Sequence, residues 1–179
     1  PFWTPTGSLP FDEHPASSAP LPDGRVLVVG DRFGTSVYLY DPATGSFGTG
    51  GAMSVRRSGA ATAPLPNGKV LVAGGRSTGS PESAQATAEL YDPATNSFSP
   101  TGSMDVPRNH AMAAPLPDGT VLVAGGTDGI TRWSSAEIYD PATGSFSGTT
   151  PMVTAIDGAA AAPLADGRVL IAGGGFPDT

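Results

Sequence analysis

The chain contains few side chains of the types that perform chemistry. It has no cysteine, which removes thiolate metal ligands, cysteine nucleophiles and disulfides together. Its two histidines, His14 and His110, occupy positions of a repeated unit that differ by one residue, so on a strand they would point in opposite directions. No phosphate-binding loop or His-Glu metal motif is present. We therefore expect no catalytic residue, metal or cofactor in this segment, and a chain that is not an enzyme.

The remaining polar and aromatic side chains suit recognition. An exposed tryptophan beside arginine and aspartate, as at Trp133, Arg132 and Asp128, could stack on a sugar or form a protein hot spot. The alternative is that Trp133 packs against its own loop. The candidate ligand-binding residues are Arg32, Phe33, Arg76, Arg108, His110, Asp128, Arg132 and Trp133.

Composition argues against several classes of partner. Charged residues make up 14% of the chain, the formal net charge is −7, and Lys69 is the only lysine. Such a chain has no basic stripe for nucleic acid or anionic lipid. No apolar run approaches the roughly 20 residues of a membrane span, and the first residues do not resemble a signal peptide. We expect neither nucleic-acid binding nor a membrane span.

Two recurring sequence blocks must position the candidate residues. The first reads APLPDGRVLVVG at Ala19–Gly30, and close copies begin at Ala63, Ala114 and Ala162, at intervals of 44, 51 and 48 residues. The second reads YDPATGSF at Tyr40–Phe47 and returns at Tyr91 and Tyr139. A period in this range marks an array of supersecondary units that bury their apolar faces against one another.

Each unit has the pattern of four short strands. In the third unit these are the small apolar run His110–Pro115, the β-branched run Thr120–Ala124, the alternating run Ser135–Tyr139 and the run Ser145–Ser147 around Phe146. Tight turns rich in Pro, Asp and Gly join the first strand to the second and the third to the fourth. No segment has a long helical period. We predict an all-β chain whose units are four-stranded antiparallel sheets.

This repeat strongly resembles the kelch motif. Its marks are a Gly-Gly doublet after the second strand (Gly74-Gly75, Gly125-Gly126, Gly173-Gly174), a tyrosine on the third (Tyr40, Tyr91, Tyr139) and an aromatic residue on the fourth (Phe47, Phe98, Phe146). The first unit departs from the pattern, with Gly30-Asp31 in place of the doublet. The resemblance implies that each unit is one blade of a β-propeller. The glycines would let backbones approach closely near the axis, and the aromatic residues would fill space between blades.

Aligning the units divides the chain, which we expect to be one kelch propeller segment over residues 1–179. Residues 1–9 align with the last strand of a preceding blade, residues 10–50, 51–101 and 102–149 with three blades, and residues 150–179 with the first two strands of a further blade. Joining the two ends would leave one blade without its third strand. We therefore expect an open arc cut from a larger propeller.

Two connections in each blade vary between units: the loop after the second strand and the segment leading to the next blade. Both would emerge on one face, opposite the near-identical turns. A recognition surface must differ around an asymmetric ligand, so we expect binding on this face. A repeated arginine at Arg57 and Arg108 and a repeated glutamate at Glu89 and Glu137 predict inter-blade ion pairs, which we favour over ligand binding.

The function we expect is a binding scaffold that presents these variable loops to a protein or glycan. One alternative is part of a secreted oxidase similar to galactose oxidase, whose copper site needs a tyrosine cross-linked to a cysteine, a second tyrosine and two histidines. Because this chain has no cysteine, such catalytic residues would lie outside the segment. Another is a structural repeat array of a bacterial surface protein. The low lysine content and the resemblance to secreted kelch arrays favour an extracellular or cell-surface location.

Overall fold

The computed structural model describes residues 5–9, 17–30, 34–77 and 83–175. Every regular element within these ranges is a β-strand. No helix that could cross a membrane is found among them.

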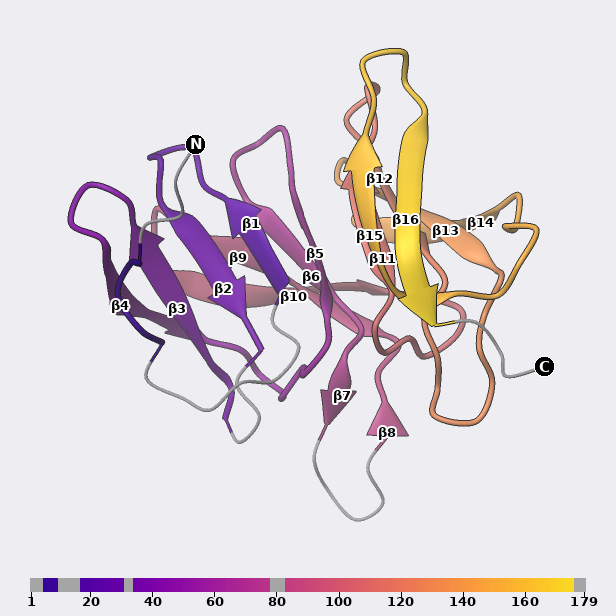
Figure 1. The fold of residues 1–179 in the computed structure, drawn as a ribbon, viewed down its shortest axis with the longest axis horizontal. Helices are drawn as coiled ribbons and strands as arrows, with labels where there is room; N and C mark the ends of the chain where they lie inside the picture. The colour runs from indigo at the N-terminus through magenta and orange to yellow at the C-terminus, as the bar shows by residue number, and fades with distance from the viewer. Residues whose placement is uncertain (1–4, 10–16, 31–33, 78–82, 176–179) are drawn as a thin grey trace.

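The strands form three consecutive four-stranded antiparallel sheets and a final pair (Figure 1). The first sheet contains β1 (Ser17–Pro20), β2 (Val26–Val29), β3 (Ser36–Asp41) and β4 (Ser46–Ala52). The second contains β5 (Ala61–Pro64), β6 (Val70–Ala73), β9 (Thr87–Asp92) and β10 (Ser97–Ser103), and the third contains β11 (Met112–Pro115), β12 (Val121–Ala124), β13 (Ala136–Asp140) and β14 (Ser145–Thr149). The pair consists of β15 (Asp157–Pro163) and β16 (Val169–Gly175). We call these sheets the first to fourth blades.

The blades are stacked side by side, as in a propeller. The first strands contact one another in sequence, β1 with β5, β5 with β11 and β11 with β15, and the last strands β4, β10 and β14 do the same. Each chain segment therefore completes one blade before starting the next. The all-β propeller arc that the repeat predicts is confirmed.

Two details differ from the sequence prediction. A short additional hairpin, β7 (Arg76–Ser77) with β8 (Ser83–Ala84), extends from the loop after β6. Residues 5–9, expected to belong to a strand, lie in no strand. They nevertheless pack on the first blade, because the backbone N–H of Gly7 donates to the carbonyl of Gly45 at 2.9 Å, just as Gly102 does to Gly144.

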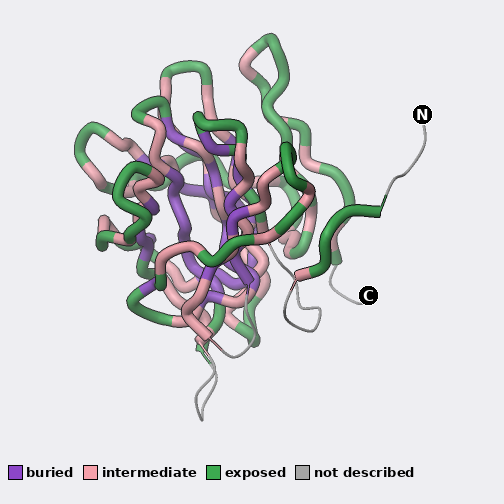
Figure 2. The backbone as a smooth tube through the Cα atoms, turned by 90° about the vertical axis from the view of Figure 1, so that its left-hand side faces the viewer, coloured by how far each residue is buried: buried purple, intermediate pink, exposed green. Residues whose placement is uncertain are grey.

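The core lies between the blades, in apolar layers formed by alternate faces of each sheet. Val70 and Val72 of β6 pack toward the first blade, whereas Leu71 and Ala73 pack toward the third. Figure 2 shows the buried stretches in the middle of the molecule and exposed turns around them. Leu170 of β16 corresponds to Leu71 but is 52% exposed, because no described blade covers it. Packing on both faces thus requires a blade on each side.

The glycine doublets bring consecutive blades into contact. Gly74 and Gly125 have φ of 69° and 67°, and a Cβ at either would overlap a carbonyl oxygen of the next connection, that of Arg108 or Ile156. The second glycine of each doublet donates its N–H to that same carbonyl, Gly75 to Arg108 at 2.8 Å and Gly126 to Ile156 at 2.9 Å. The close approach expected from the sequence is therefore present.

Two alanine substitutions distinguish the free-energy cost of a clash between blades from the cost of the left-handed backbone conformation. Gly173 has a similar φ of 79°, but nothing lies within 4 Å of a Cβ placed there. We expect Gly173→Ala to cost about 1–2 kcal/mol for the left-handed conformation alone. Gly125→Ala should cost about 1–3 kcal/mol more, because the fourth blade must shift. Equal losses in urea-induced unfolding would show that the contact between the blades is not tight.

The hydroxyl of each repeated tyrosine takes part in a hydrogen-bonded contact at the boundary with the preceding segment or blade. Its ring packs on the phenylalanine of its own blade, with centroids 5.1 Å apart for Tyr91 and Phe98. In the link between the second and third blades, the Thr101 hydroxyl lies 2.8 Å from the Tyr139 hydroxyl. Thr6 makes the same contact with Tyr40 at 2.7 Å.

The link between the first and second blades is built differently. Gly50 stands where the other links have threonine, so no hydroxyl is available there. Asn96 replaces the glycine of the DPATG turn at φ 51°, and its Oδ1 accepts hydrogen bonds from the Tyr91 hydroxyl and the Gly51 N–H, both at 2.8 Å. The two substitutions compensate for each other.

The same pair of residues, glycine and asparagine, can be introduced into the link between the second and third blades. Thr101→Gly should lower the free energy of unfolding by about 1–3 kcal/mol, because it leaves the buried Tyr139 hydroxyl without a partner. Adding Gly144→Asn should recover most of the loss, because the asparagine then occupies the place of Asn96 in the first link. A double-mutant cycle in urea measures the coupling. If the loss of unfolding free energy in the double variant equals the sum of the two single losses, the asparagine does not replace the threonine.

Candidate functional site

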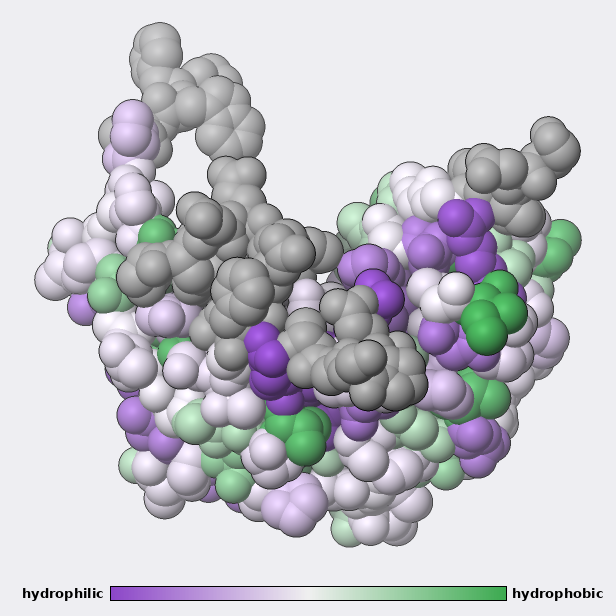
Figure 3. Space-filling model, turned by 90° about the horizontal axis from the view of Figure 1, so that it is seen from below, coloured by the Kyte–Doolittle hydropathy of each residue, from purple (hydrophilic) through white to green (hydrophobic). Residues whose placement is uncertain are grey.

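The variable loops and connections lie at one end of the blades. In Figure 1 the turn between β15 and β16 points up, whereas the β7–β8 hairpin points down. Figure 3 views the molecule from the hairpin side, where strongly hydrophilic side chains and a few isolated hydrophobic ones reach the surface. We call this end the variable-loop face.

The opposite turns have a packing reason to be alike. Pro66 in the turn of the second blade lies 3.1 Å from a Cβ placed on Gly119, and Pro117 lies 3.4 Å from one on Gly167. Each turn thus rests on the turn of the preceding blade. This nesting constrains these turns in the same way from blade to blade.

A cleft of about 160 Å³ opens between the second and third blades on the variable-loop face. One wall is formed by Arg76 and Ala84 of the β7–β8 hairpin. The other is formed by Asn109, His110 and the loop segment 127–129. We call it the inter-blade cleft. It combines two variable loops and one connection, and it contains three of the predicted binding residues, Arg76, His110 and Asp128.

His110 has an unusual backbone conformation. Its φ is 55°, in the left-handed region that favours glycine, and the corresponding residues of the neighbouring blades are Gly59 and Gly158. Strain of this kind persists where surrounding structure enforces it, often at functional sites. His110 lines both the inter-blade cleft and a second hollow of about 200 Å³, shared with Gly59, Gly158 and Ser17 of the first strands.

Asn109 is the buried polar residue of the cleft. It is 7% exposed, and its Oδ1 has no hydrogen-bond partner. That oxygen and the His110 ring pack over Gly59, where any Cβ would overlap them. A buried acceptor without a donor costs free energy. The corresponding residues are Ser58 and Asp157, and the buried Oδ1 of Asp157 likewise has no hydrogen-bond partner, although it forms an ion pair with Arg132.

Asp128 orders the loop beside the cleft. Its Oδ1 accepts the backbone N–H groups of Thr131 at 2.6 Å and Ile130 at 2.8 Å. These two bonds hold the pKa of the Asp128 carboxyl below its ordinary value, so it is ionised at neutral pH. The Thr127 hydroxyl accepts the Gly129 N–H at 2.9 Å. Ile130 stands at the tip of this turn, 96% exposed.

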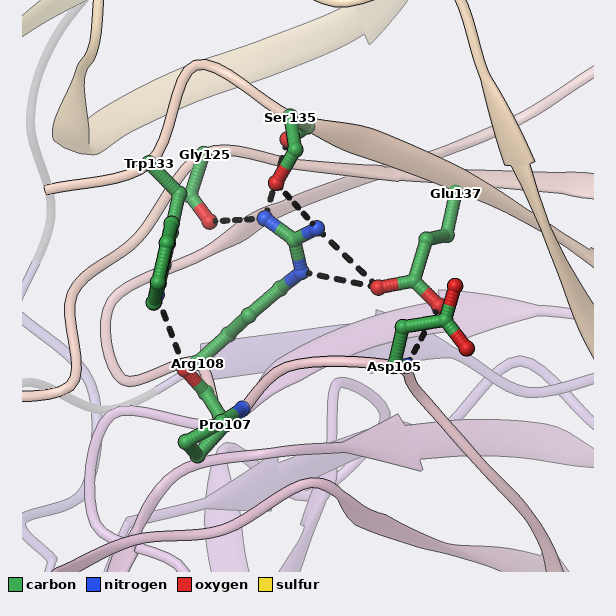
Figure 4. A network of polar contacts seen from close by, with 7 residues as sticks. All are labelled: Asp105, Pro107, Arg108, Gly125, Trp133, Ser135 and Glu137. Carbon is green, nitrogen blue, oxygen red and sulfur yellow. Dashed lines mark hydrogen bonds and ion pairs between the residues drawn. The ribbon is translucent and has the colours of Figure 1, made fainter.

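Arg108 is buried, contrary to the expectation that it contacts a ligand. It is 1% exposed and spreads its guanidinium over the third blade (Figure 4). Nη2 donates to Glu137 Oε1 at 3.0 Å, and Nη1 donates to the carbonyls of Gly125 at 2.7 Å and Ser135 at 2.9 Å. The other oxygen of Glu137 accepts the backbone N–H of Asp105 at 2.9 Å.

Arg57 repeats this arrangement in the second blade. Its Nε donates to Glu89 Oε1 at 2.9 Å, and Nη1 donates to the carbonyls of Gly74 and Thr87. The two predicted Arg–Glu pairs therefore form, but each side-chain pair lies within one blade and its incoming connection. The inter-blade contact is made by the arginine backbone instead, as the bond from Gly75 to the carbonyl of Arg108 shows.

The other predicted residues of the third blade are partly engaged. The Trp133 indole N–H donates to the carbonyl of Pro107 at 3.0 Å, so the half-buried side chain is bonded to the connection that enters the third blade. Arg132 pairs with Asp157 at 3.2 Å. Arg32 and Phe33 lie outside the described residues.

The comparisons with known proteins agree on the repeat. Family models described as the kelch motif match residues 56–105 and 108–153. The chain belongs to the kelch-repeat family. A solved structure described as the structure of YjhT superposes with a TM-score of 0.72 at 18% identity, covering 88% of this chain and 56% of that chain. This likeness shows the fold alone, and the chain spans little more than half the length of YjhT. No curated protein matches the sequence.

Two residues of this kelch site were missed by the sequence reasoning. Asn109 sits beside the repeated Arg108, and Ile130 lies in a loop that differs in every blade. Aligning His110 with Gly59 and Gly158 shows a histidine at a glycine position, and this signal points to the segment. No group of three or more potential metal ligands occurs in the part of the chain that the structure describes.

The buried arginine network of the kelch blades should dominate local stability. Glu137→Ala leaves the buried Arg108 charge uncompensated and should lower the free energy of unfolding by about 3–5 kcal/mol. Asp166→Ala removes an exposed pair with Arg168, whose side chains are 51% and 78% exposed, and should change the free energy of unfolding far less. Denaturant midpoints compare the two, and similar losses would contradict the network's role.

Proposed function

We propose that this kelch segment is a non-enzymatic scaffold that binds a protein or glycan on its variable-loop face. The observation that carries the proposal is the inter-blade cleft, which joins loops of two blades, with Arg76 on one wall and Asn109, His110 and Asp128 on the other. A hollow with convergent polar groups is the usual form of a binding site.

The comparison among blades supports the same location. His110 takes a strained conformation where the other blades use glycine, although glycine would suffice for the fold. Asn109 keeps a buried polar side chain unsatisfied beside it. The strained backbone of His110 is a cost that the neighbouring blades avoid by having glycine, and it favours a role beyond folding.

We further propose that more blades flank this segment. Leu170 is half exposed where Leu27 and Leu71 are fully buried at the corresponding positions. Another blade packed on β15 and β16 would bury it. The ligand would then meet a face wider than the arc described here.

The site can be tested by giving the third blade the residues of the second. Asn109→Ser with His110→Gly reproduces Ser58 and Gly59, and it should keep the fold because it removes the positive φ of a non-glycine residue. The probes are a phage-displayed random peptide library and a glycan array, each screened on the wild-type chain. We expect the selected binders to lose at least tenfold in affinity for the double variant.

The control is Asp118→Asn in the turn of the opposite face, which should leave binding unchanged. Binders that tolerate the double variant but lose affinity with Asp118→Asn would place the site on the other face. Thermal unfolding of all variants shows whether lost binding reflects lost fold.

A further inference from the structure

The loop at the edge of the inter-blade cleft holds a large apolar side chain in water. Ile130 is 96% exposed, and Gly129 before it has nothing within 4 Å of a Cβ placed there. Exposing an isoleucine in this way forgoes the gain that burial would bring. The residue stands clear of the fold and is available to a partner.

The turn that carries Ile130 is ordered by the chain itself. Asp128 Oδ1 accepts the N–H groups of Ile130 and Thr131, and the Asp128 N–H donates to the Thr131 carbonyl at 3.1 Å. The base of the loop is joined to the preceding connection, because Thr127 and Asn109 exchange two backbone hydrogen bonds of 2.8 and 2.9 Å. A preorganised loop loses little conformational entropy on binding.

The chemistry beside Ile130 fits a polypeptide. The cleft places Arg76, a donor, on one wall and the ionised Asp128, an acceptor, on the other. A peptide offers both backbone donors and acceptors, together with apolar side chains that can cover Ile130. A glycan gains little from isoleucine. The tryptophan suited to stacking on a sugar, Trp133, is half buried and bonded to Pro107.

We infer that the ligand of the variable-loop face is a protein, that Ile130 is its apolar anchor, and that polar groups of the same partner enter the inter-blade cleft. This inference rests on the proposed function and names the partner class of the same site. Asp128 acts as a positioning residue, because it holds the turn from which Ile130 projects.

The experiment uses peptides selected from the phage-displayed library on the wild-type chain. Ile130→Ser should weaken their binding about tenfold to a hundredfold, the amount expected for losing one buried isoleucine side chain. Ile130→Val should lose much less. Leu164 is a partly exposed apolar residue in the turn between β15 and β16, on the opposite face, so Leu164→Ser is the control and should leave affinity unchanged.

The positioning role of Asp128 is tested separately by hydrogen exchange. Asp128→Ala should weaken peptide binding and speed hydrogen exchange at the Ile130 and Thr131 amides, whereas Asp128→Asn, which keeps a carbonyl acceptor, should restore part of both. An unchanged exchange rate in Asp128→Ala would overturn this role.

The remaining outcomes separate this inference from the proposed function. Peptides that tolerate Ile130→Ser but are lost with the Asn109→Ser and His110→Gly pair would overturn the anchor and leave the proposed function standing. Selection of glycans alone, sensitive to that pair, would overturn the protein assignment. Equal losses for Ile130→Ser and Leu164→Ser would show non-specific hydrophobic adhesion and overturn the anchor. Failure of both libraries to yield a binder would overturn both proposals.

Discussion

The connection that enters the third blade is held in two directions by Arg108. Its carbonyl accepts a hydrogen bond from Gly75, in the glycine doublet of the preceding blade. Its side chain is buried against a glutamate and two carbonyls of the blade that follows. A buried charge is tolerated only when it is fully paired, so the position of the connection is fixed closely. The loops of the variable-loop face are displayed from this fixed base.

The fourth blade shows that the buried arginine–glutamate pair requires a complete sheet. Ile156 stands in the place of Arg57 and Arg108, and the described part of that blade has no third strand to supply a glutamate. Ile156 still accepts the hydrogen bond from Gly126, because that contact needs only a backbone carbonyl. The inter-blade bond and the ion pair are therefore separable. One is a property of the backbone, and the other requires both partners.

Much of the fold follows from the sequence because its signals are local and repeated. The glycine doublets, the tyrosines and the DPATG turns each recur at fixed spacing, so their roles could be inferred from one another. The pairing of Arg108 with Glu137 could be predicted, but its location within one blade could not, because spacing does not show the direction of a long side chain.

The candidate site was less predictable from the sequence. Arg108 is charged and lies in a variable connection, yet it is buried, whereas Ile130 is apolar and fully exposed. Burial depends on the neighbouring blades, and the repeat pattern alone does not specify it.

The alternative links between blades have a consequence for how the array assembles. A Cβ at Gly50 would lie 2.7 Å from Cγ2 of Val37, whereas Thr101 fits because the residue corresponding to Val37 is Ala88. The link between the first two blades thus uses Gly50, Val37 and Asn96, and the next uses Thr101, Ala88 and Gly144. Near-identical repeats risk pairing in the wrong order, with one another or with a second chain, while they fold. The two kinds of link are not interchangeable. A blade placed beside the wrong neighbour would therefore have a steric clash or an unpaired tyrosine hydroxyl, and this disfavours incorrect pairing.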